Sequence, residues 1–89
     1  MASSLIIIDQ IERTVNGAYS DWQIGITDDS ARTKAQLGNP LSWLQWQANS
    51  PEDAIVVVEY FQKKGMQDAG YITKSADFVY IVLVDRLTL

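Results

Sequence analysis

The chain of 89 residues contains no cysteine and no histidine. The lack of cysteine excludes a disulfide framework and a thiolate zinc site. The lack of histidine removes the commonest general base, the Ser-His catalytic arrangement and imidazole metal sites. Any acid–base chemistry would therefore fall to carboxylates, tyrosine or lysine.

Long apolar segments are also missing. The longest runs, at residues 5–8 and 78–84, are far too short to span a bilayer. The N-terminal sequence MASSLIII has neither the basic region nor the apolar length of a signal peptide. With 47% apolar and 20% charged residues, the composition is typical of a folded protein. We expect a single cytoplasmic domain, residues 1–89, that does not contact a membrane.

Positive charge is scarce, and the formal net charge is −4. An isolated nucleic-acid-binding domain usually carries a basic surplus, because neutralised phosphates supply most of its affinity. Four of the seven basic residues lie in two pairs, Arg32 with Lys34 and Lys63 with Lys64. These four residues are the candidate nucleic-acid contacts. The alternative interpretation is ordinary solvated helix surface.

Hydrophobic periodicity and capping residues predict helices at 4–16, from 28 or 29 to 37, and at 51–64, with strands at 22–27, 43–48 and 78–84. The seven apolar residues at 78–84 indicate a strand covered on both faces, at the centre of the sheet. Residues 66–77 are predicted to form a long loop, and such loops often bind ligands. The expected fold is α/β (α+β), in the order α-β-α-β-α-β, with a small, roughly three-stranded sheet packed by about three helices.

One segment resembles a known family. The run QIGITDDSAR, residues 23–32, is similar to the second signature of GIY-YIG nuclease domains. In that family a Tyr-Ile-Gly strand end is followed by a Thr, a polar turn and a helix that carries an Arg. Arg32 lies seven residues after Gly25, at the spacing of the signature. The predicted helix at 51–64 looks like the family helix with an Ala-x-x-x-Glu pattern, with Ala54 at the alanine position. The resemblance covers roughly residues 22–65 and implies a GIY-YIG-like fold.

Several residues that the family uses for catalysis are replaced in this chain. Gln23 stands where the signature has Tyr, and Gln36 stands where the family has a His or Tyr. The metal-binding Glu of the family would fall at Val58. Glu59 is adjacent, but one residue along a helix turns the side chain by about 100°, away from the predicted apolar stripe.

The Gly-Ile-Tyr strand that precedes this signature in the family has no counterpart upstream of Trp22. The strand predicted at 78–84 resembles it, with Tyr80 at a suitable position, so a permuted arrangement would fill that place in the sheet. The alternative is that Tyr80 is a core or edge aromatic residue.

The missing catalytic groups favour a domain without enzymatic activity. We predict a protein-interaction or assembly module that binds an unknown protein partner or forms a homo-oligomer, and that needs no cofactor. Of the three tryptophans, Trp43 would anchor a partner if it is exposed, because aromatic residues dominate binding hot spots. Packing in the core is the alternative role for Trp43.

Two other functions stay open at this stage. A divergent metal-dependent nuclease would need Mg²⁺, with Arg32 and Tyr80 as catalytic residues and Glu59 or Asp28 as metal ligands. A nucleic-acid binder without cleavage would use Arg32 together with the three lysines named above. The alternative for Asp28 is a helix cap, and for Arg32 it is an ion pair with a nearby aspartate.

Overall fold

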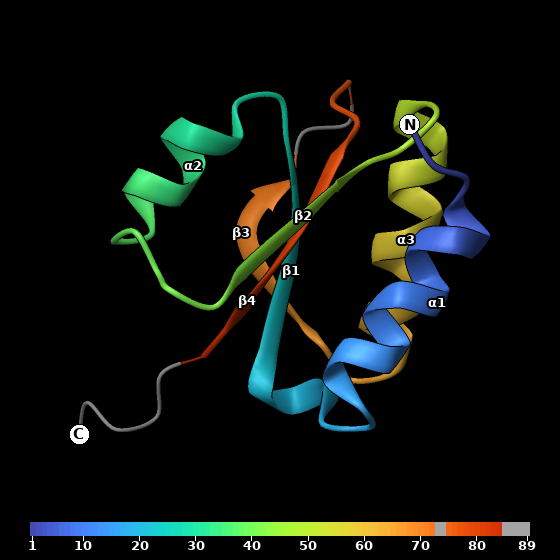
Figure 1. Cartoon of the computed structure of the whole chain (residues 1–89), viewed down its shortest axis with the longest axis horizontal. Helices are drawn as coiled ribbons and strands as arrows, with labels where there is room; N and C mark the ends of the chain where they lie inside the picture. Colours follow the sequence, from blue (N-terminus) through green and yellow to red (C-terminus); the bar gives the residue numbers. More distant parts are fainter. Residues whose placement is uncertain (73–74, 85–89) are drawn as a thin grey trace.

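The structure is a computed structural model that describes residues 1–72 and 75–84 (Figure 1). Its elements are α1 (Ser4–Val15), a 3-10 helix (Tyr19–Asp21), β1 (Trp22–Thr27), α2 (Ser30–Gln36), β2 (Trp43–Gln47), α3 (Pro51–Lys63), β3 (Gln67–Ile72) and β4 (Phe78–Leu83). Over these ranges, three α-helices and one four-stranded mixed sheet form an α+β fold, which confirms the predicted class. No helix in the described part of the chain is long and apolar enough to cross a membrane.

The fourth strand, β3, corrects the predictions of a roughly three-stranded sheet and of the order α-β-α-β-α-β. It lies in the segment 66–77, which the sequence predicts as a loop. Its sequence, QDAGYI, contains Asp, Ala and Gly, residue types that are depleted in strands. Propensity therefore gives no signal, and backbone pairing with β1 forms the strand instead. Residues 73–74 of the expected loop lie outside the described residues.

The strands are arranged in the order β2-β4-β1-β3. Strand β4 runs antiparallel to both β1 and β2, whereas β3 runs parallel to β1. The interior position of β4 confirms the prediction made from its unbroken apolar run. The register aligns Gly25 of β1 and Gln45 of β2 with Tyr80 of β4. Because aligned residues of adjacent strands project to the same side, these three lie on one face of the sheet.

Helices α2 and α3 begin where side chains accept hydrogen bonds from the first backbone N–H groups. The Asp29 carboxylate accepts from the Arg32 N–H at 3.0 Å, which confirms one of the two predicted caps of α2. Ser50 Oγ accepts from the Asp53 N–H at 3.1 Å, and Pro51 follows in the first turn of α3. A cap of this kind contributes about 1 kcal/mol, so these boundaries are set locally by the sequence.

Helices α1 and α3 pack against each other and cover one face of the sheet, whereas α2 lies on its other side (Figure 1). We call these the covered face and the open face. A fully buried Val, Ile or Phe side chain contributes about 1.5–3 kcal/mol, and most such side chains lie under the covered face. The largest contributors are Ile7, Ile11, Ile24, Ile26, Val57, Phe61, Val79 and Ile81.

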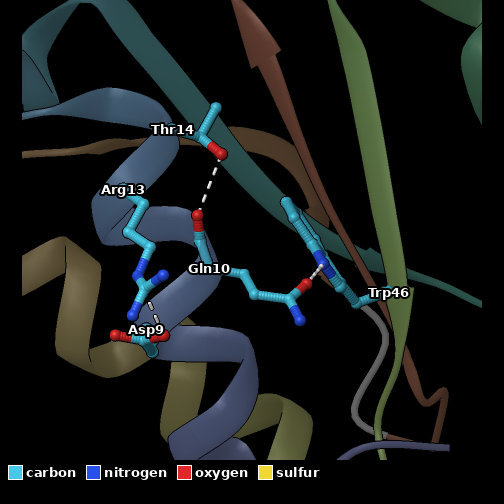
Figure 2. Close-up of polar contacts among 5 residues, drawn as sticks. All are labelled: Asp9, Gln10, Arg13, Thr14 and Trp46. Carbon is cyan, nitrogen blue, oxygen red and sulfur yellow. Dashed lines mark hydrogen bonds and ion pairs between the residues drawn. The ribbon is translucent and has the colours of Figure 1, made fainter.

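Trp46 connects β2 to α1 at the margin of the covered face. Its indole N–H donates a 2.6 Å hydrogen bond to Gln10 Oε1, and its ring packs against the core (Figure 2). On the neighbouring surface of α1, Thr14 Oγ1 donates to the Gln10 carbonyl, and Arg13 pairs with Asp9 at 3.2 Å. Exposed ion pairs contribute at most about 1 kcal/mol, so packing holds α1 in place more than charge does.

Candidate functional site

The open face of the sheet is built around a stack of two aromatic rings. The Tyr80 side chain points away from its neighbours Val79 and Ile81, which belong to the core under the helices. Tyr80 is nevertheless fully buried, because Trp43 of β2 covers it. The ring centres are 4.4 Å apart and the planes differ by 9°. Tyr80 is therefore a buried aromatic residue, as one of the two alternatives predicts.

Gly25 of β1 makes room for this stack on the other side of Tyr80. A Cβ atom placed on Gly25 would overlap the Tyr80 hydroxyl and would lie 2.8 Å from Tyr80 Cε1. Real Cβ atoms essentially never approach that closely. The glycine that contributes to the resemblance with the GIY-YIG signature therefore has a packing reason of its own in this chain.

Thr27 and Thr33 join α2 to the open face at one end of β1. Both side chains are buried, and their hydroxyl oxygens form a 2.7 Å hydrogen bond. The Thr27 hydroxyl also accepts from the Asp29 N–H at 2.9 Å. This contact fixes α2 over one end of the open face. The part of the open face around Trp43 is not covered by α2.

Strand β2 forms one outer edge of the sheet. Its sequence, WLQWQ, contains no charged residue. Proteins usually protect an edge strand with charge, proline or a bulge, because its outward backbone groups can pair with another chain. Only the end of this edge is occupied in the described structure, where Ala2 forms a parallel bridge with Ala48.

Exposed apolar side chains gather along this edge. Leu41 is fully exposed just before β2, Leu44 is 41% exposed on β2, and Leu83 is 42% exposed on the neighbouring β4. Leu44 is aligned with Ile81, which makes Leu83 its diagonal neighbour on the same side of the sheet. We define the β2 edge patch as Leu41, Trp43, Leu44, Gln45 and Leu83.

Trp43 itself is half-buried, so it is neither a fully exposed anchor nor a fully buried core residue. One side of its ring lies against Tyr80, and its indole N–H donates a 2.8 Å hydrogen bond to the exposed Gln45 side chain. Trp43 therefore packs within the molecule and also contributes to the β2 edge patch.

The structure does not bring the four predicted nuclease residues together. Glu59 is exposed on α3, beyond the covered face, while Tyr80 is buried on the open face under Trp43. Val58, where the family places its metal-binding Glu, is buried in the core. Arg32 and Asp28 are both exposed near the start of α2. A phosphodiester would have no access to the Tyr80 hydroxyl in this arrangement.

In the described part of the chain, no cluster of metal-ligating side chains accompanies these residues. Within residues 1–72 and 75–84, no group of three or more acidic side chains is placed to hold a metal ion. Asp29 caps α2, which leaves Asp28 as a single exposed carboxylate beside it. Arg32 forms no ion pair with another residue in the same ranges, and only its backbone N–H contacts the Asp29 carboxylate.

The four candidate nucleic-acid contacts form two separate groups. Arg32 and Lys34 lie on α2, on the open side of the sheet, whereas Lys63 and Lys64 lie at the end of α3, on the covered side (Figure 1). Lys64 Nζ also lies 5.4 Å from the centre of the Tyr60 ring. A duplex tracks one continuous basic surface, and these residues do not provide one.

A cluster that the sequence does not suggest joins α1, the 3-10 helix and α3. Glu12 Oε1 accepts a hydrogen bond from the Tyr19 hydroxyl at 2.6 Å, and Glu12 Oε2 accepts one from the Tyr60 hydroxyl at 2.8 Å. The hydrogen bond from Tyr19 is the main reason that the pKa of Glu12 lies below its usual range. The same bonds raise the pKa values of both tyrosines. Because every group is paired, we interpret this Glu12 cluster as a structural clamp.

Comparisons with protein-family models, with curated proteins and with solved structures found no match. The likeness to GIY-YIG domains stays a prediction from the sequence.

Proposed function

We propose that this chain is a GIY-YIG-like domain without catalytic activity that acts as a protein-interaction or assembly module through the β2 edge patch. The observation that carries the proposal is the group of exposed leucines on and beside an uncharged outer strand. Exposed apolar groups that cluster at one place on a small domain are typical of contact surfaces, whereas singly scattered ones are not.

On the opposite face of the same edge, Trp43 adds a rigid aromatic residue whose orientation is already fixed by its stack on Tyr80. A side chain that is ordered before binding loses less conformational entropy when a partner arrives. The net charge of −4 is also more compatible with a protein partner than with nucleic acid.

The geometry gives the nuclease alternative little support. An enzyme of that plan would need a metal ligand, a proton acceptor and a cation around one phosphate. Glu59 and Tyr80 lie on opposite sides of the sheet, and an arginine side chain such as that of Arg32 offers hydrogen-bond donors but no acceptor for a proton.

The test is affinity capture of the tagged chain from cells that express it, followed by identification of the bound proteins. The wild type is compared with the double variant Leu41→Glu/Leu44→Glu. The control is Val56→Glu, because Val56 is similarly exposed but lies on α3. We expect at least one bound protein, which includes another copy of the chain, to be retained by the control and lost from the double variant.

A bound set that is the same for all three proteins would overturn the proposal. So would cleavage of DNA in Mg²⁺ by the purified chain that is lost in Arg32→Ala, because that result would restore the nuclease function.

A further inference from the structure

We infer that the partner at the β2 edge patch is a second copy of this chain, with the two β2 strands paired antiparallel about a two-fold axis. This inference rests on the proposed function, because it takes the β2 edge patch as a contact surface. It adds the identity of the partner and the register of the contact.

The backbone of β2 shows which groups are free to pair. The Leu83 N–H donates to the Ser42 carbonyl at 3.1 Å, and the Ala48 N–H donates to the Asp77 carbonyl at 2.8 Å. In an antiparallel ladder the residues that bond to one neighbour alternate with those that face the other way. Even-numbered residues of β2 therefore bond to β4, and Trp43 and Gln45 direct their backbone groups outward.

The N-terminal segment confirms this alternation at the far end of the strand. The Ala2 N–H donates to the Gln47 carbonyl at 2.9 Å, and the Asn49 N–H donates to the Ala2 carbonyl at 2.8 Å. The outward groups of β2 thus already accept an extended segment. Those of Trp43 and Gln45 pair with no other described residue.

One register uses both outward residues of each copy. If Leu44 lies opposite Leu44 of the second copy, Trp43 pairs with Gln45 of the second copy and Gln45 pairs with its Trp43. Each of these pairs exchanges two backbone hydrogen bonds, so the four outward N–H groups and the four outward carbonyls of Trp43 and Gln45 in the two copies are satisfied together. The contact is isologous, which is the commonest form of symmetric dimer.

The side chains fit this register. The two Leu44 side chains would meet at a closely spaced pair on one face and would cover the apolar surface that each now exposes. On the other face, Trp43 would lie beside Gln45 of the second copy. The strand is uncharged, so the paired strands themselves add no charge repulsion between two chains of charge −4. Because the contact is short, we expect a weak dimer that depends on concentration.

Sedimentation velocity over a range of protein concentrations tests self-association, with three variants of β2. Gln45→Pro removes an outward N–H that the sheet itself does not use, and Leu44→Glu places two carboxylates at the axis. Each should weaken the dimer at least about tenfold. Gln45→Ala keeps the backbone N–H and should weaken the dimer much less than Gln45→Pro does. Circular dichroism and thermal unfolding verify that each variant is folded.

The register has a separate test, because the chain contains no cysteine. Leu44→Cys should form an intermolecular disulfide on mild oxidation, since opposite residues at such a pair have Cα atoms about 4.5 Å apart. Gln47→Cys is the matched control. It should stay reduced, because the two thiols would lie on opposite sides of the axis.

A chain that remains monomeric at every concentration would overturn the inference, as would a dimer that Gln45→Pro leaves unchanged. If the chain is monomeric but captures a different protein that Leu41→Glu/Leu44→Glu loses, the inference fails and the proposed function stands. If neither self-association nor such capture occurs, both fail. Equal oxidation of the Leu44→Cys and Gln47→Cys variants would overturn the register.

Discussion

The two faces of the sheet are stabilised in different ways. The covered face is an aliphatic core under two helices, in which many branched side chains share the burial. The open face carries α2 at one end, and its centre contains a layered contact in which Trp43 lies over Tyr80 and Tyr80 lies over Gly25. Burial shared by many residues tolerates small changes, whereas a stack of three residues depends on the shape of each one.

The largest expected effect tests whether both faces contribute to one cooperative structure. Phe61→Ala removes the largest side chain of the covered core and should lower the free energy of unfolding by about 3–5 kcal/mol. Tyr80→Ala should lower it by about 3 kcal/mol, because Trp43 can settle partly into the space. Urea denaturation followed by circular dichroism measures both values. A loss below about 1 kcal/mol for Tyr80→Ala would mean that the open face contributes little to folding.

A smaller substitution, at Gly25, tests whether the stack on the open face depends on the shape of each residue. Gly25→Ala should lower the free energy of unfolding by about 1–3 kcal/mol, because the new methyl group overlaps the Tyr80 ring. In a Tyr80→Leu background the same substitution should cost less, since the ring is absent. The double-mutant cycle reports this coupling. Equal costs in both backgrounds would show that the stack does not determine the residue at position 25.

The smallest effect concerns the Glu12 cluster, which joins the two helices of the covered face. Because the pKa of Glu12 is lowered in the folded protein, mainly by the Tyr19 hydroxyl, its contribution is present above the ordinary glutamate pKa of about 4.3. The contribution is lost as the pH falls through the lowered value. Glu12→Gln should therefore cost about 1 kcal/mol at neutral pH, and the difference from wild type should shrink as the pH falls below about 4.

Thermal unfolding at neutral and acid pH measures this difference. Glu59→Gln is the matched control, because Glu59 is an exposed carboxylate on α3. It should change the stability by less than about 0.5 kcal/mol at either pH. A penalty for Glu12→Gln that stays constant into acid would contradict the clamp.

The sequence predicts the helices and three of the strands because their signals are local. Ser50 with Pro51 marks the start of α3, and the spacing of apolar residues identifies the side of each helix that is buried. Strand β3 carries no such signal, since it exists through pairing with β1, whose partner residues are more than forty positions away in the chain. The strand propensities of single residues do not report pairing between segments that are distant in the chain.

The candidate site shows the same division. The sequence identifies Trp43 as a potential anchor from residue type and alternation, but the stack on Tyr80 joins positions 43 and 80 and depends on strand order. The predicted role of Glu59 as a metal ligand gains no support, because Val58 occupies the buried side of α3. This reason is local and can be found in the sequence. The Glu12 cluster was not predicted, since Tyr60 lies 48 residues away from Glu12.

The position of Ala2 at the end of β2 limits how much of this edge can pair with another strand. Because its hydrogen bonds to Gln47 and Asn49 occupy that end of the edge, an incoming strand can pair only along the first part of β2. A short available edge resists slipping in register, since a shifted strand would collide with the N-terminal segment. The same segment that extends the sheet therefore acts as a stop for any strand that pairs with β2.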